Sequence, residues 1–175
     1  MVSFFKAERE SAGWRFLLVW LVASFAGFLP GIALEQLYLG GINFSIGVPL
    51  AFFGQGWVLN RHISLYLPWT IGSSIIWWVA LALTSGTMSM LPMDSIAMWI
   101  QLSTNAAMAG AAVGVLQWWL LREWLPNIGV WWIAVSAVNW ALFLPGVITG
   151  FVLMWALDYV VVPMEDRHYE LSGEY

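Results

Sequence analysis

Five polar residues stand within otherwise apolar stretches of this sequence, and they are the side chains best placed to bind a ligand. They are Glu35, Gln101, Asn105, Asn139 and Asp158. Burying such groups among apolar side chains costs free energy, so they are retained where they form a site or bond to one another. The sequence predicts a polar cavity where Glu35, Gln101 and Asp158 meet, with Asn105 one helical turn from Gln101. The simpler alternative leaves the carboxylates at a surface and the amides in hydrogen bonds between helices.

Catalytic motifs are missing from the sequence. It contains no cysteine and two histidines, His62 and His168, which stand far apart. Neither H-E-x-x-H nor G-x-S-x-G occurs, and no glycine-rich loop could cradle a phosphate. We therefore expect no enzymatic activity, no metal site and no resident cofactor. His62 is a weak candidate for an axial ligand to the metal of a pigment, although beside Arg61 a surface histidine is the simpler interpretation.

Composition indicates where these residues must lie. The chain of 175 residues is 61% hydrophobic and 9% charged, against roughly a quarter charged in an average soluble domain. Several apolar stretches exceed the ~20 residues that a helix needs to cross a bilayer, and no alternation typical of a barrel is visible. The sequence thus predicts an all-α, polytopic membrane helix bundle. The net charge of −4, without a basic stripe, argues against nucleic acid as a partner.

The expected bundle has five transmembrane helices, with six as the alternative. The apolar segments cover residues 14–37, 44–59, 69–90, 96–121 and 129–162. The last is long enough for one kinked helix, or for two short spans broken at LPGVITG around Pro145 and Gly146. The transmembrane domain, 14–162, follows an interfacial N-terminal segment, 1–13, and precedes a polar, acidic tail, 163–175.

Positive charges predict the orientation of the bundle. Lys6, Arg9 and Arg15 precede the first segment, and Arg61 and Arg122 follow the second and fourth. With five spans all of these charges fall on one side, so we expect a cytoplasmic N-terminus and a C-terminus outside. Indoles and arginines would anchor the two turns among lipid headgroups. These anchors are Trp57, Arg61, Trp118, Trp119, Arg122 and Trp124.

The two turns belong to an internal repeat. GWVLNRHISLYLPW (56–69) and QWWLLREWLPNIGVWW (117–132) each carry a tryptophan four residues before an arginine, and a proline and a tryptophan after it. Aligned on the arginines, Gln55 falls one place out of register with Gln117. The chain therefore reads as two helical hairpins plus a single helix that starts a third copy.

The repeated pattern, a helix ending in Q-W-x-x-L-R followed by a tryptophan-rich helix, resembles a broad set of small multi-spanning prokaryotic membrane proteins. The second copy has the full form, at Gln117, Trp118, Leu121 and Arg122. The resemblance covers the second to fifth segments. It implies a prokaryotic inner membrane, cytoplasmic or internal, and no particular activity.

Two further features predict how the helices pack. In NAAMAGAAVG, a stripe of small residues allows another backbone to approach closely, and its members are Ala106, Gly110 and Gly114. FLPG occurs twice, at 28–31 and 143–146. Because proline frees a carbonyl and glycine admits a neighbour, we expect paired helix breaks, or kinks that serve packing alone. The expected breaks are Pro30, Gly31, Pro145 and Gly146. We expect one or both FLPG helices to clasp the stripe.

Two functions fit these expectations. The first is a non-catalytic accessory or scaffold subunit of a larger membrane complex, because catalytic groups are missing and the aromatic faces exceed what five short helices can bury. The alternative is a small transporter or solute-binding subunit with a site near the paired breaks. Expected partners are membrane lipids and other membrane protein subunits. The sequence leaves both alternatives, a bound lipid or pigment and none, unresolved. Polar residues that converge on a cavity would favour transport, whereas separate bonds between helices would favour the scaffold.

Overall fold

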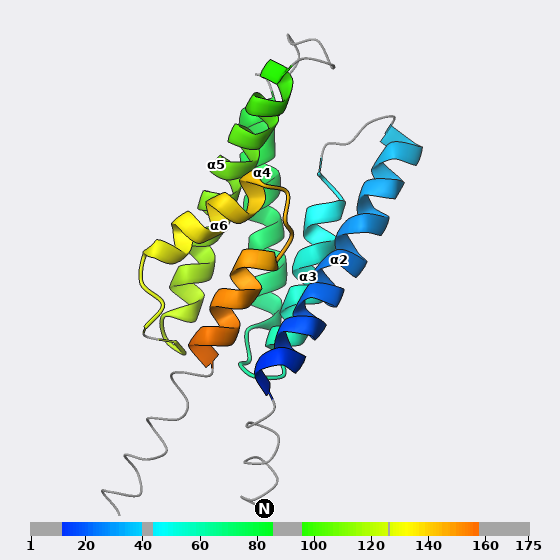
Figure 1. Cartoon of the computed structure of the whole chain (residues 1–175). Coiled ribbons are helices and arrows are strands. Elements are labelled where there is room, and N and C mark those ends of the chain that lie inside the picture. The colour runs from blue at the N-terminus through cyan, green and yellow to red at the C-terminus, as the bar shows by residue number, and fades with distance from the viewer. Residues whose placement is uncertain (1–11, 40–43, 86–95, 126, 158–175) are drawn as a thin grey trace, which may run out of the picture.

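The computed structural model describes residues 12–39, 44–85, 96–125 and 127–157, and the regular structure in these ranges is entirely helical (Figure 1). In chain order the elements are α2 (Ala12–Leu39), α3 (Gly47–Leu59), the π-helical turn η1 (Pro68–Gly72), α4 (Ser73–Ser85), α5 (Ile96–Leu121) and α6 (Trp131–Ala141). A last helix covers Val147–Leu157. The all-α prediction is confirmed for this part of the chain.

Two stretches, Gly13–Tyr38 and Ile96–Leu121, are long and apolar enough to cross a membrane by length and composition. α5 has the bounds predicted for the fourth segment. α3 starts three residues later than the predicted second segment, because Phe44 has a φ of 60° and cannot belong to a helix. Pro30 lies inside α2 without ending it.

The fifth apolar segment is two helices broken at LPGVITG, the second of the two alternatives that the sequence left open, and not one kinked helix. The chain turns at residues 142–146, where Phe143 and Gly146 have φ values of 52° and 79° that no right-handed helix allows. We call residues 142–146 the elbow. Beyond the elbow the chain reverses, and Leu157 lies at the same end of the bundle as Ala12 (Figure 1). A continuous fifth helix would have carried it to the opposite end.

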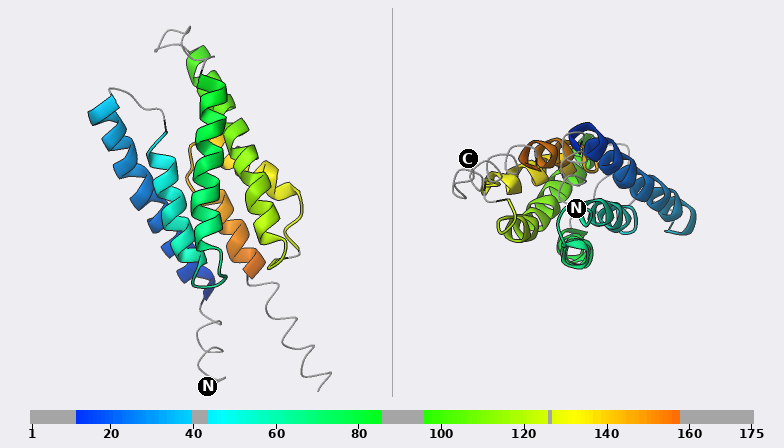
Figure 2. Two further views of the ribbon diagram at one scale, coloured as in Figure 1. Left: turned by 180° about the vertical axis from the view of Figure 1, so that it is seen from behind. Right: turned by 90° about the horizontal axis from the view of Figure 1, so that it is seen from below.

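The two ends of the bundle differ in what they contain. At one end α2 begins, and residues 60–67 and 122–130 join α3 to η1 and α5 to α6. We call this the turn end. At the other, the loop end, α2 and α4 finish and α5 begins. The helices run alternately between the two ends, as the views in Figure 2 show.

Three helical hairpins build the structure. They are α2 with α3, η1 and α4 with α5, and α6 with the last helix. From α2 to α6, consecutive helices pack against one another. The last helix bonds to α6, where Ile148 donates to Asn139, and it returns to α2, where Gly150 lies against Trp20 and Leu17. The hairpins therefore form a closed circuit of neighbours rather than an open row.

The first helix of each hairpin carries the same three buried positions. A tryptophan is followed after four residues by a serine, and after four more by an aromatic residue, which places all three on one helix face. The sets are Trp20, Ser24 and Phe28 in α2; Trp69, Ser73 and Trp77 in η1 and α4; and Trp132, Ser136 and Trp140 in α6. The first helix of the third copy thus has all three buried positions, as the first helices of the other two copies do.

The second helices repeat as well. Trp57, Trp119 and Trp155 are 51%, 50% and 48% exposed, and two positions before each stands a buried residue. Those buried residues are Gln55, Gln117 and Leu153. Gln55 therefore corresponds to Gln117, and the one-place offset inferred from the arginines is wrong. The last helix supplies the second half of a third copy that the sequence analysis left as a single helix.

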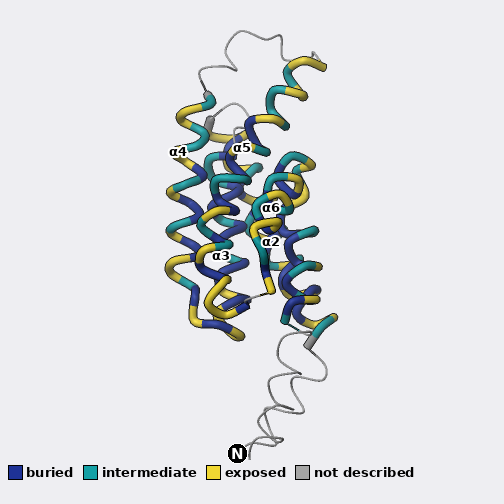
Figure 3. The backbone as a smooth tube through the Cα atoms, turned by 90° about the vertical axis from the view of Figure 1, so that its left-hand side faces the viewer, coloured by how far each residue is buried: buried dark blue, intermediate teal, exposed yellow. Residues whose placement is uncertain are grey.

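Aromatic side chains fill the middle of the bundle at two levels. Toward the turn end, Trp20, Trp69 and Trp132 share a core cluster with residues of the two turns. Toward the loop end, Phe28, Trp77 and Trp140 share a second cluster, with ring centroids 5.0 Å apart for the two tryptophans. Figure 3 shows buried residues facing inward along the helices and exposed residues facing outward.

Candidate functional site

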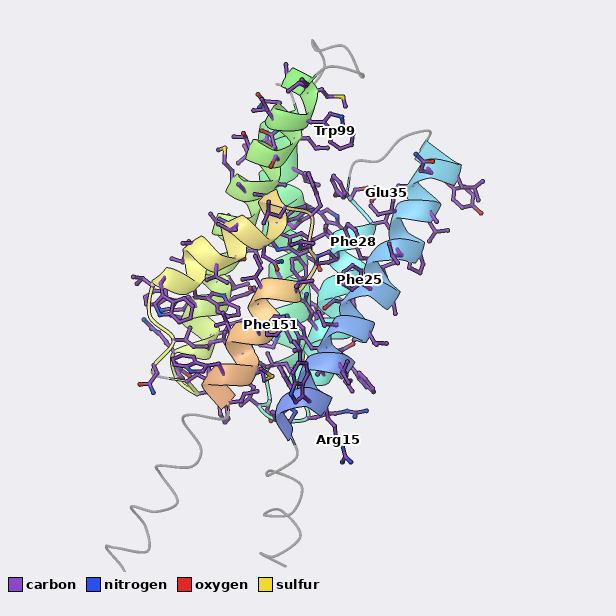
Figure 4. The ribbon with its side chains drawn as sticks, viewed as in Figure 1. Arg15, Phe25, Phe28, Glu35, Trp99 and Phe151 are labelled. Atoms are coloured by element: carbon purple, nitrogen blue, oxygen red, sulfur yellow. The ribbon has the colours of Figure 1, made fainter. Side chains whose placement is uncertain are left out.

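Glu35, the expected carboxylate of the polar cavity, bonds to the start of α3. It is fully buried on α2, and its carboxylate accepts hydrogen bonds from the backbone N–H groups of Phe44 at 2.7 Å, Gly47 at 3.2 Å and Ile46. No side chain at the N-cap position Ile46 provides such an acceptor. Glu35 thus takes the role of a capping residue from a neighbouring helix, and Figure 4 shows it facing the segment that leads into α3.

The other predicted cavity residues bond elsewhere. Gln101 donates to Asn105 at 2.9 Å, and Asn105 donates to the carbonyl of Thr84 on α4 at 3.4 Å. Asn139 on α6 accepts from the backbone N–H of Ile148 at 3.0 Å, on the far side of the elbow. Asp158 lies outside the described residues. The bonds of Glu35, of the Gln101 and Asn105 pair, and of Asn139 therefore reach three different segments, namely the start of α3, α4 and the last helix.

A polar level that the sequence analysis missed separates the two aromatic levels. Gln55 donates to Ser24 at 3.2 Å and Gln117 donates to Ser73 at 3.3 Å, so each bond links the two helices of one hairpin. The third serine, Ser136, donates to the carbonyl of Gly110 at 2.8 Å. The repeated spacing of tryptophan, serine and aromatic residue is the signal that could have revealed this level.

The two FLPG segments are not equivalent, which corrects the prediction of paired helix breaks. Pro30 and Gly31 lie within α2, where Gly31 allows the backbone of α3 to approach: a Cβ there would lie 2.7 Å from the Gly47 nitrogen. Pro145 and Gly146 form the elbow. The carbonyl of Gly146 accepts from the Trp20 indole at 2.8 Å, so the elbow is fixed to α2.

The three equivalent tryptophans differ in one respect. Trp20 donates its indole N–H to the elbow, whereas the N–H groups of Trp69 and Trp132 are buried and have no hydrogen-bond partner among the described residues. A buried donor without an acceptor costs on the order of 1–3 kcal/mol. Of these three described tryptophans, Trp20 alone has a bonded N–H, and its acceptor lies where the third hairpin bends.

The predicted stripe of small residues packs closely, and its partner is α6. A Cβ on Gly110 would lie 2.9 Å from the Ser136 carbonyl oxygen, and one on Gly114 would lie 2.9 Å from the Ser136 Cβ. Ala106 is buried on the same helix. α6, which precedes the second FLPG, packs on the stripe. The helix that contains the first FLPG, α2, packs on α3 through Gly27 and Gly31.

The predicted anchors gather at the turn end. The guanidinium of Arg61 stacks on Trp57, 4.0 Å from its ring centroid, and that of Arg122 lies 5.6 Å and 5.8 Å from the rings of Trp118 and Trp119. Trp124 is exposed beside them. His62 is also exposed, with its ring edge on Phe16, so it lies at the surface of the first turn rather than between helices.

Large apolar side chains cover the outside of the bundle. Of the adjacent pair on α4, Trp77 is 1% exposed and Trp78 is 50% exposed. Trp99 is exposed at the start of α5, in the gap toward α2 that Figure 4 displays.

No protein-family model, curated protein or solved structure matches the chain. Its function is therefore inferred from its geometry.

Proposed function

We propose that the chain is an integral membrane protein. Only 28% of each long apolar window is buried inside the bundle, whereas the central helix of a soluble protein would be mostly covered. The exposed positions carry leucine, isoleucine, valine and tryptophan, which lipid tails would cover. A single hairpin of this kind could be a signal or a core element, but three in a closed circuit favour a membrane domain.

The spacing of exposed tryptophans supports a bilayer-sized layer. Trp99 near the loop end and Trp119 near the turn end are both exposed on α5. The 20 residues between them rise about 30 Å, the thickness of the hydrocarbon core. Trp57 and Trp155 lie at the same depth as Trp119 through the repeat, so indoles surround the bundle at one boundary, where they prefer to lie.

The orientation follows from the arginines. Arg15, Arg61 and Arg122 all lie at the turn end, so we place that end on the cytoplasmic side of a prokaryotic inner membrane. α6 has 11 residues and rises roughly 16 Å, about half of the bilayer. The third hairpin therefore enters from the cytoplasmic side and returns to it, and residue 157 lies on the same side as residue 12.

For the function, we propose a non-catalytic scaffold or accessory subunit of a larger membrane complex. One observation carries this proposal: Glu35, Asn105 and Asn139 each bond to a backbone group of a neighbouring segment, in three different places along the bundle. Aromatic rings fill the middle of the bundle above and below the serine level. With its interior closed, the surface is the part of the molecule left to bind a partner.

One observation favours the transporter alternative. The elbow interrupts a helix at membrane depth, which is how discontinuous transporter helices expose backbone groups to a substrate. Here, however, the Gly146 carbonyl bonds to Trp20 and the Ile148 N–H bonds to Asn139. Because those groups already have protein partners, the elbow fits a structural role better than a substrate site.

The scaffold proposal can be tested by native purification. The tagged chain is extracted in a mild detergent and separated by blue-native electrophoresis. We expect it to migrate with a defined second membrane polypeptide, and Trp78→Ala to weaken this association, because exposed tryptophans dominate interface energetics. Val22→Ala, at an exposed position on α2, is the control for nonspecific loss of apolar surface. A wild-type chain that migrates alone would contradict the scaffold and favour the transporter.

A further inference from the structure

Two exposed arginines at the turn end lie against indole rings and have no anionic partner among the described residues. Arg61 stacks on Trp57, and Arg122 lies within 6 Å of both Trp118 and Trp119. Neither guanidinium bonds to a carboxylate or a carbonyl in the part of the chain that the structure describes. Each carries five N–H donors in a planar fork, and stacking covers a face of that plane while leaving its edge free.

The free edge of a stacked guanidinium suits one kind of ligand. Two of its N–H groups can donate in parallel to two oxygens of a phosphate, a bidentate geometry that an ammonium group cannot provide. The indoles hold the plane in place, so less side-chain entropy is lost when the phosphate binds. At the depth of the exposed tryptophans, the phosphates available are those of lipid headgroups.

We propose that Arg61 and Arg122 form two binding sites for the phosphodiester headgroups of anionic phospholipids in the cytoplasmic leaflet. The inference rests on the proposed membrane orientation. Each site consists of an arginine and a tryptophan four residues before it, in corresponding turns of the first two hairpins. An anionic headgroup is preferred to a zwitterionic one, because the latter brings a cationic amine toward the same arginine. The stoichiometry is two lipids per chain.

Native mass spectrometry can count these lipids. The protein is purified with phosphatidylcholine alone and then given phosphatidylglycerol of the same acyl chains. We expect two bound phosphatidylglycerol molecules on the wild type, lower occupancy of one site on Arg61→Gln or on Arg122→Gln, and lower occupancy of both sites on the double variant. Each lost contact should weaken binding at its site about fivefold. Arg15→Gln is the matched control, since Arg15 is exposed at the same end and stacks on no described indole.

Three results would overturn the inference. Equal retention by the wild type and the double variant would place the lipid elsewhere. Equal retention of phosphatidylcholine would remove the preference for anionic headgroups. Displacement of the lipid by excess inorganic phosphate would identify a site for free phosphate. Unchanged melting temperatures of the variants in phosphatidylcholine exclude misfolding as the cause of a loss. A chain that alkaline carbonate washes from membranes would refute the membrane proposal itself, whereas an embedded chain without lipid selectivity would refute this inference alone.

Discussion

Trp20, Trp69 and Trp132 show how residues in equivalent, equally buried positions can have different energetic roles. All three fill the aromatic level near the turn end. Within the described part of the chain, Trp20 alone of the three has an acceptor for its N–H, the carbonyl of Gly146. The acceptor exists because the third hairpin bends at residues 142–146, whereas α2 continues through the first FLPG. The sequence contains the three tryptophans but no sign of which would be bonded, because the acceptor lies 126 residues away.

The difference predicts unequal effects of the same substitution. Trp20→Phe removes the bond to Gly146, whereas Trp69→Phe removes a donor that has no described acceptor. Both lose similar buried volume, so we expect Trp20→Phe to be the more destabilising by about 1 kcal/mol. Thermal unfolding in detergent measures this difference. Equal losses would show that the Trp20 bond contributes no net stability.

Glu35 gives a second prediction at the scale of one residue. Its carboxylate accepts the N–H groups at the start of α3, so Glu35→Ala leaves those donors unpaired and should cost about 2 kcal/mol. The neighbouring Gln36 is exposed, and Gln36→Ala should change stability by less than about 0.5 kcal/mol. Thermal melts of the two variants provide the comparison. If Glu35→Ala melted like the wild type, the capping role would be refuted.

At the scale of elements, the sequence predicted helices well and their breaks poorly. The bounds of α5 agree with hydropathy because the segment is hydrophobic overall and lacks charged residues and proline. The fifth segment is equally apolar, yet it bends, because Gly146 adopts a positive φ and sits where a Cβ would lie 2.9 Å from the indole nitrogen of Trp20. The first FLPG has the same letters but continues as a helix against α3. Hydropathy cannot distinguish the two FLPG segments, because contacts with other helices decide whether each segment bends.

The repeat shows the same limit. Aligning the copies on their arginines placed Gln55 out of register, because Arg61 stands six residues after Gln55 whereas Arg122 stands five residues after Gln117. Buried residues set the register instead, since a one-place shift would turn the inner face of a helix outward. The stripe of small residues was predicted from spacing alone, because close helix contacts need small residues whichever helix is the partner.

The contact between α5 and α6 gives a prediction at this scale. Gly110→Leu would push bulk into the backbone of α6 near Ser136 and should destabilise the bundle by about 2 kcal/mol or more. Val115→Leu adds volume on the exposed face of the same helix and should be nearly neutral. The difference in melting temperature in detergent checks the expectation. Identical melting temperatures would mean that α5 and α6 do not pack through this stripe.

For the whole molecule, the central claim is a closed circuit of three hairpins in which the third enters the membrane from the cytoplasmic side and returns. Composition predicts a membrane bundle, because lipid tails would cover so apolar a surface. The side of the membrane on which residue 157 lies was not predictable, because it depends on whether the fifth segment bends. The bonds of the elbow to Trp20 and of Ile148 to Asn139, on which the scaffold proposal draws, depend on the same bend.

Cysteine accessibility tests this claim most directly, because the chain has no cysteine of its own. Single cysteines are introduced at Asn127 in the second turn, at Leu157 after the third hairpin, and at Gln36 near the loop end, and are labelled with a membrane-impermeant maleimide in intact and opened vesicles. We predict that Asn127→Cys and Leu157→Cys react from the same face and Gln36→Cys from the other. Reaction of Leu157→Cys from the face opposite to Asn127→Cys would show that the fifth segment crosses the membrane, and would contradict the closed circuit.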